Sequence, residues 1–157
     1  KEKMEAIDHT IRTLVIKHPY SSILMSFPGL KEKSAAIIIS AVKDINNWPT
    51  KNKFKKGLGV YGIVKETGEK HIKFRRGFSG DRMCRQGLFM VCLTAAHLKS
   101  RNDFQDYYER QVQKGKPRIK ALVATMGKLA EIMYHCLKFN EPYQYQSSNH
   151  VKSKFEC

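Results

Sequence analysis

The most informative stretch of the sequence covers residues 57–90 and reads GLGVYGIVKETGEKHIKFRRGFSGDRMCRQGLFM. Glycines open it at positions 57, 59 and 62, and a Thr-Gly and a Ser-Gly pair at 67–68 and 79–80 mark two turns. Six cations fall within sixteen residues of it: Lys70, Lys73, Arg75, Arg76, Arg82 and Arg85. Sharply folded backbone and clustered cations suit a phosphate. The alternative is a glycine-rich surface loop with solvated side chains.

The two halves of this stretch predict different structures. The short runs at 60–64 and 71–74 are typical of two strands, which would place Thr67 at the tip of a small β-hairpin. From residue 82 to residue 99 the apolar spacing predicts a long helix with one buried face. That face consists of Leu88, Val91, Cys92, Ala95 and Leu98.

Upstream, the pattern predicts two helices around a Pro-Gly turn. A short helix is expected near residues 23–26 and a longer one over 33–45, with Pro28 and Gly29 between them. This resembles a helix-hairpin-helix, in which N–H groups at the start of the second helix contact a DNA phosphate. Gly29, Lys31 and Lys33 are therefore candidate nucleic-acid-binding residues. An ordinary helical corner buried in the core is the alternative.

Further helices are expected on both sides of these motifs. Residues 4–17 carry apolar side chains at helical spacing, and their stripe fits either another helix or the chain's own domain. Thr50 is expected to cap a helix over 51–56, in which Phe54 points inward and Lys55 and Lys56 are candidate phosphate contacts or a solvated face. Trp48 is interpreted as a packing anchor.

The C-terminal part predicts two more helices, over 104–113 and 120–137. The turn between them carries Lys116, which suits a phosphate as well as ordinary helix punctuation. After Lys138 the chain becomes polar and poor in helix formers. We expect a mainly α fold with the helix-hairpin-helix-like motif and a small β-hairpin or turn element, divided into a leading helix at 1–18, a domain at 19–140 and a polar tail at 141–157.

The charge of the chain points to a polyanionic partner. Its formal net charge is +15, from 29 basic and 14 acidic residues. A field of this size favours nucleic acid, although a basic protein without such a partner is the alternative.

The sequence contains no apolar run of membrane-spanning length and no visible signal peptide, so we expect a cytoplasmic protein that does not bind a membrane. Its four cysteines form no C-x-x-C pair and its histidines are scattered, so no metal site is expected in this chain.

In order, these motifs resemble the C-terminal, serine-nucleophile domain of the DEDD-type bacterial insertion-sequence transposases, a family of RNA-guided recombinases. The resemblance runs from about residue 24 to residue 137. The matching pieces are Leu24-Met25-Ser26-Phe27-Pro28-Gly29-Leu30-Lys31, residues 54–59, Lys65-Glu66-Thr67-Gly68, Gly80-Asp81 with Arg85, Gly115-Lys116 and residues 121–137. The family's serine falls on Thr67, its proline on Gly62 and its last hairpin glycine on Lys31.

The resemblance implies a function and a set of roles. It implies DNA binding and strand exchange in transposition, with the hydroxyl of Thr67 attacking a DNA phosphodiester. Arg75, Arg76 and Arg85 are expected to stabilise the charge that develops, and Ser79 is the second candidate nucleophile. His71 or Glu66 could accept the proton. Lys70, Lys73 and Arg82 complete the expected nucleic-acid contacts.

Partners and completeness follow from the same resemblance. It implies DNA, a guide RNA and a homo-oligomer of the full-length protein. Because the chain starts at Lys1 and lacks the family's acidic tetrad, we expect a fragment, with Mg²⁺ bound only by an N-terminal domain that precedes it. A non-catalytic nucleic-acid-binding module is the alternative, which the threonine at the serine position favours. A helical interaction protein with incidental charge is a third interpretation.

Overall fold

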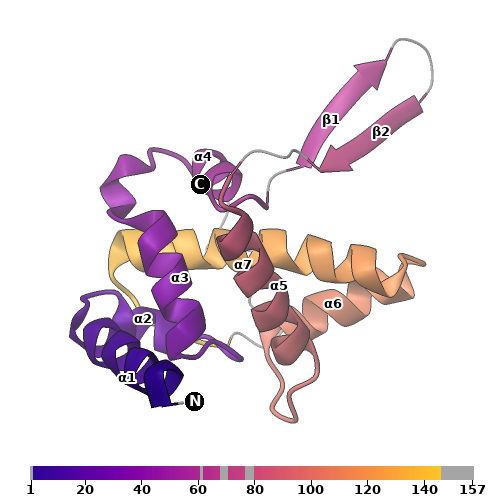
Figure 1. Ribbon diagram of the computed structural model, residues 1–157. Coiled ribbons are helices and arrows are strands. Elements are labelled where there is room, and N and C mark those ends of the chain that lie inside the picture. The colour runs from indigo at the N-terminus through magenta and orange to yellow at the C-terminus, as the bar shows by residue number, and fades with distance from the viewer. Residues whose placement is uncertain (1, 61, 68–70, 77–79, 146–157) are drawn as a thin grey trace.

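The computed structural model describes residues 2–60, 62–67, 71–76 and 80–145, with side chains over 3–60 and 80–145. Its elements are α1 (Glu2–Lys17), α2 (Ser21–Met25), α3 (Glu32–Val42), the 3₁₀ turn η1 (Ile45–Asn47), α4 (Lys51–Gly57), β1 (Gly62–Thr67), β2 (His71–Arg76), α5 (Arg82–Ala96), α6 (Asp103–Gln113) and α7 (Arg118–Phe139). The expectation of a mainly α fold is confirmed. In Figure 1 the antiparallel β1–β2 hairpin extends away from the helical body.

The core is built around α7 and α5, with buried side chains added from α2, α3 and α4 and with Phe104 from α6. Figure 1 shows these helices gathered around α7. Thr50 caps α4 as expected, since its hydroxyl oxygen accepts the N–H of Lys53 at 3.3 Å. Phe54 is fully buried, and Trp48 stands edge-on to it with ring centroids 5.8 Å apart. Trp48 also donates its indole N–H to the carbonyl of Val42 at 3.0 Å. The interpretation of Trp48 as a packing anchor is confirmed.

The turn between α2 and α3 has the features of a type II β-turn. Leu30 donates its N–H to the carbonyl of Phe27 at 3.2 Å, with Pro28 and Gly29 at the two central positions. Gly29 has φ +78°, which this turn requires at its third residue. A methyl group at Gly29 would lie 3.0 Å from the carbonyl oxygen of Val91, so this turn packs closely on α5. Whether it works as a helix-hairpin-helix remains a prediction.

Helix α1 packs on the rest of the molecule through only part of its apolar stripe. Val15 is buried and Ile11 is partly buried, whereas Ile7 and Leu14 are 58% and 65% exposed. Lys33 of α3 forms an ion pair with Asp8 of α1 at 2.6 Å. The stripe therefore packs in part against the chain's own domain.

Residues 140–145 turn back onto the helical body. Asn140 ends α7 in the left-handed conformation that helix ends favour. The Tyr143 ring then stacks on Phe27 and Phe104, with centroid distances of 5.0 and 5.4 Å. Tyr145 also donates its hydroxyl to the Asp106 carboxylate at 2.9 Å, so the described part of the predicted polar tail is docked on the domain. Residues 146–157 lie outside the described residues.

Candidate nucleic-acid interface

The two ends of the hairpin segment meet at a contact that we call the hairpin base, formed by residues 57–60 and by Gly80 and Asp81. Asp81 donates its N–H to the carbonyl of Gly57 at 2.9 Å. Gly80 has φ +97°, and a methyl group there would collide with the Lys56 carbonyl and lie 2.5 Å from the Gly59 nitrogen. Only glycine fits where the backbone at Gly80 passes against that of Lys56 and Gly59, a contact that we call the backbone crossing. The crossing joins the hairpin to the end of α4 and the start of α5.

Helix α5 begins with a side-chain cap at the hairpin base. Asp81 accepts the N–H of Cys84 on its carboxylate at 2.7 Å. Burial, together with the Asp81 charge, raises the pKa of the Cys84 thiol to about 12. Because only a thiolate is a strong nucleophile, Cys84 is not a candidate for the attacking group at neutral pH.

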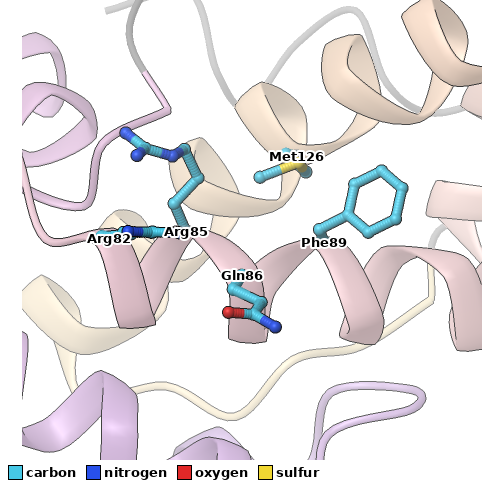
Figure 2. Close-up of a pocket in the computed structure, with 5 residues that line it drawn as sticks. All are labelled: Arg82, Arg85, Gln86, Phe89 and Met126. Atoms are coloured by element: carbon cyan, nitrogen blue, oxygen red, sulfur yellow. The ribbon is translucent and has the colours of Figure 1, made fainter. Parts of the chain in front are cut away.

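One face of α5 lines a pocket with α7, which we call the arginine pocket. Its volume is about 220 Å³ and its lining residues are Arg82, Arg85, Gln86, Phe89 and Met126. In Figure 2 the side chains of Arg85 and Phe89 lie on the side of α5 that faces Met126 of α7. The pocket thus combines two guanidinium groups with an aromatic ring and a thioether, and it lies next to the hairpin base.

Arg85 has an unsatisfied donor at this pocket. Among the described residues, its Nη1 is buried and has no hydrogen-bond partner. Arg85 also packs against the hairpin base, since a methyl group at Gly59 would lie 3.0 Å from the same nitrogen. A buried N–H without an acceptor costs about 1–3 kcal/mol, and more for a charged group. An anionic oxygen is the acceptor that would best remove this cost.

The hairpin register separates residues that the sequence had suggested as one cluster. Thr67 pairs with His71 at the far end of the hairpin, whereas Arg75 pairs with Ile63 and Arg76 with Gly62 beside the hairpin base. At about 3.4 Å per residue, Arg75 and Arg76 stand about 14 and 17 Å along β2 from the partner of Thr67. Arg85 is on α5, at the same end as Arg75 and Arg76.

The backbone thus places Arg75 and Arg76 at the base end of the hairpin and Thr67 at the other end. Lys73, opposite Lys65, lies between these two ends. Lys70 and Ser79 lie outside the described residues, although Ser79 directly precedes Gly80 of the hairpin base. The predicted roles of these residues remain predictions.

The other candidate contacts are spread over the helical body. Gly29 lies in the α2–α3 turn, which packs toward the C-terminal half of α5, whereas Lys31 is the N-cap of α3 and Lys33 lies in its first turn. Lys55 forms an ion pair with Glu131 of α7 at 2.8 Å, whereas Lys56 is exposed near the hairpin base. Lys116 donates to the side chain of Gln111 at 2.6 Å, at the α6–α7 turn.

Sequence reasoning missed Gln86 and Phe89 and treated Met126 only as core filler. Met126 is indeed 3% exposed, yet it also lines the arginine pocket. Positions 82, 85, 86 and 89 fall at the i, i+3, i+4 and i+7 spacing of one helix face, which is the signal that could have joined them. Nothing in the local sequence indicates that Met126 faces them from α7.

Over the part of the chain that the structure describes, no three His, Cys, Asp or Glu side chains gather where they could hold a metal ion. Within the same residues, no helix combines the length and the apolar character that crossing a bilayer requires.

Comparison with known proteins decides the family. The model of the transposase IS116/IS110/IS902 family matches residues 21–109, more than half of the chain. The chain belongs to this family. The match includes α2, α3, α4, the hairpin and α5, and it therefore contains the hairpin base and all of the arginine pocket except Met126.

Curated relatives agree with this assignment. An insertion element IS110 protein of 43.6 kDa from Streptomyces coelicolor is 23% identical over 91% of the chain and 35% of its own length. Pilin gene-inverting proteins from Moraxella bovis and Moraxella lacunata are 26% and 25% identical over 90% of the chain and 45% of their own lengths. The chain thus spans about a third to a half of the length of these relatives.

Proposed function

We propose that this chain is the DNA-binding and strand-exchange part of a transposase or recombinase. The observation that carries the proposal is the hairpin base, where a glycine crossing holds a basic hairpin beside the arginine pocket. The family assignment, the names of the relatives and the formal net charge of +15 support it. The hairpin and the start of α5 form the proposed DNA-facing side.

The proposed reaction is a transesterification at phosphorus. The Thr67 hydroxyl oxygen forms a bond to the DNA phosphorus while the bond from phosphorus to a deoxyribose oxygen breaks. His71, the register partner of Thr67, takes the hydroxyl proton, and the departing deoxyribose oxygen takes up a proton. Arg75, Arg76 and Arg85 are the proposed guanidinium groups for the non-bridging oxygens.

The register adds a condition to this reaction. Arg75 and Arg76 pair near the hairpin base, whereas Thr67 pairs at the other end. The two arginines and Thr67 can therefore act on the same phosphate only if the hairpin bends or if they come from different chains of an oligomer. We infer a homo-oligomer and a guide RNA for the full-length protein, and Mg²⁺ bound by residues outside this chain. Sedimentation of the full-length protein with and without bound RNA tests the first two points.

The test of the nucleophile is a covalent protein–DNA adduct formed by the full-length protein. On denaturing gels with end-labelled DNA, the native protein and Thr67→Ser should give the adduct, whereas Thr67→Ala should not. Ser79→Ala is the matched control, because Ser79 is the other turn hydroxyl in this stretch. If Ser79→Ala abolishes the adduct and Thr67→Ala keeps it, Ser79 is the nucleophile instead.

The second candidate function is a nucleic-acid-binding module without catalysis. Two observations favour it: a threonine occupies the family's serine position, and the register separates it from Arg75 and Arg76. This candidate predicts DNA binding with a steep salt dependence and an adduct only after Thr67→Ser. A chain that shows no affinity for DNA at low salt would contradict both candidates.

A further inference from the structure

We propose that the arginine pocket receives one unpaired nucleotide of a nucleic-acid strand, with its base against Phe89 and Met126 and its phosphate on Arg82 and Arg85. The inference rests on the proposed function and deepens it, because it names the form of nucleic acid that this part of the molecule holds. Strand exchange requires nucleotides that have left their original partners, and such nucleotides need a binding site.

The lining of the pocket fits a base. Met126 is buried on α7, and Phe89 packs partly on the core, so both side chains are held in place. A base has an apolar face that stacks on aromatic rings with little regard to sequence. The volume of about 220 Å³ is below the roughly 300–1,000 Å³ of pockets for drug-sized ligands, which suits one ring system.

The charge of the pocket fits a phosphate. Among the described residues, neither Arg82 nor Arg85 forms an ion pair, and the Asp81 carboxylate already accepts the N–H of Cys84. The buried Nη1 of Arg85 lacks an acceptor. A phosphate beside the partly exposed Arg85 and the exposed Arg82 brings the opposite charge to both guanidinium groups.

The location of the pocket also fits an unpaired nucleotide. Arg85 contacts the hairpin base through Gly59, so a strand that follows the basic hairpin toward the helical body reaches the pocket at the start of α5. A duplex cannot present a base to a concave site of this size without unstacking it. A nucleotide that is already unpaired does not incur that cost.

The experiment compares duplexes that differ at one nucleotide. Fluorescence anisotropy would measure binding of the chain to a fully paired DNA duplex, to the same duplex with one unpaired thymidine, and to one with an abasic residue in its place. We expect the unpaired thymidine to bind about 5-fold or more tighter than the abasic residue, the scale of one base–aromatic stack. The same three duplexes made of RNA, with uridine in place of thymidine, show whether the pocket prefers DNA or RNA.

Matched variants assign the effect to the pocket. Phe89→Leu keeps an apolar side chain and removes the ring, so it should bring the thymidine-to-abasic ratio close to one. Met90→Ala is the control on the same helix, because Met90 is 53% exposed and does not line the pocket. Phe89→Ala gives a second removal of the ring, and circular dichroism checks that each variant is folded.

The outcomes separate this inference from the proposed function. Binding to every duplex with no preference for the unpaired base, in DNA and in RNA, overturns the pocket assignment and leaves the proposed function standing. A preference that survives both Phe89 variants also overturns it. Absence of binding to any nucleic acid overturns the proposed function and, with it, the inference.

Discussion

At the scale of single residues, the hairpin base depends on Gly80. A methyl group there meets backbone atoms of Lys56 and Gly59, which cannot rotate away as a side chain can, and its φ is +97°. We expect Gly80→Ala to lower the free energy of unfolding by more than about 2 kcal/mol. Urea denaturation followed by circular dichroism measures it.

Gly115 offers the matched control. Its φ is +81°, but among the described residues a methyl group there meets no atom within 4 Å. Gly115→Ala should therefore lower the free energy of unfolding only by the cost of holding alanine in a left-handed backbone conformation, about 1–2 kcal/mol. Equal losses at both positions would show that the backbone crossing at Gly80 is not tight.

The buried thiols predict how stability depends on pH. Burial raises the pKa of Cys136 to about 11 and that of Cys84 to about 12, from 9.0 in both cases, and it also raises the pKa of Cys92. The unfolded chain thus loses these protons at lower pH than the folded chain. Their contribution to stability is complete below pH 9 and is lost as the pH rises toward the folded values.

Unfolding experiments at pH 8, 9, 10 and 11 check this. Between pH 9 and 11 each of these buried thiols lowers the free energy of unfolding by up to about 1.4 kcal/mol per pH unit. Cys84→Ser removes one titrating group and should make the fall shallower by about that amount, even though it lowers stability overall. An unchanged slope in Cys84→Ser would contradict the assignment of a raised pKa to this thiol.

At the scale of elements, the segment after α7 should stabilise the domain. Tyr143 donates its N–H to the Ser26 hydroxyl at 2.8 Å and its own hydroxyl to the Asp103 carboxylate at 2.8 Å. Its ring stacks on Phe27 and Phe104. We expect a chain that ends at residue 140 to be less stable by about 2–4 kcal/mol than one that ends at residue 145.

Tyr143→Phe separates the two contributions. It keeps the stacked ring and removes the hydroxyl, so the loss should be about 1 kcal/mol. Thermal unfolding of the two truncated chains and of this variant provides the measurement. If truncation at 140 and at 145 gives the same stability, the docked segment contributes nothing.

Periodicity predicted most elements because it depends on local sequence. Helix α7 was expected at 120–137 and covers Arg118–Phe139, and the hairpin was expected from two short runs around Thr67. Helix α5 ends at Ala96, three residues before the expected end, where Asn102 bonds the Ala95 carbonyl and caps α6. A capping contact between two helices cannot be derived from apolar spacing.

The candidate site was less predictable, because proximity along the chain is not proximity in space. Thr67, Arg75 and Arg76 are close in sequence, but an antiparallel hairpin places the first at one end and the others at the opposite end. Conversely, Met126 joins Arg85 and Phe89 across about forty residues, and only the packing of α7 on α5 shows it. Register counting could have revealed the first fact; the second required the structure.

At the scale of the whole molecule, the net charge of +15 raises the question of whether it acts as a general field or through particular contacts. Two exposed cation pairs allow a comparison: Lys53 and Lys56 on α4 near the hairpin base, and Lys114 and Lys120 around the α6–α7 turn. Removing either pair lowers the formal charge by the same two units. A general field therefore predicts the same effect from both.

A contact surface at the hairpin predicts different effects. Each phosphate contact adds about 0.9 to the slope of log affinity against log salt concentration, because binding releases a condensed counterion. We expect Lys53→Ala with Lys56→Ala to reduce the slope for a DNA duplex by about 1–2, and Lys114→Ala with Lys120→Ala to leave it nearly unchanged. Anisotropy titrations between 50 and about 200 mM salt measure both. Equal reductions would mean that the charge acts as a diffuse field and that the hairpin side is not the preferred contact surface for DNA.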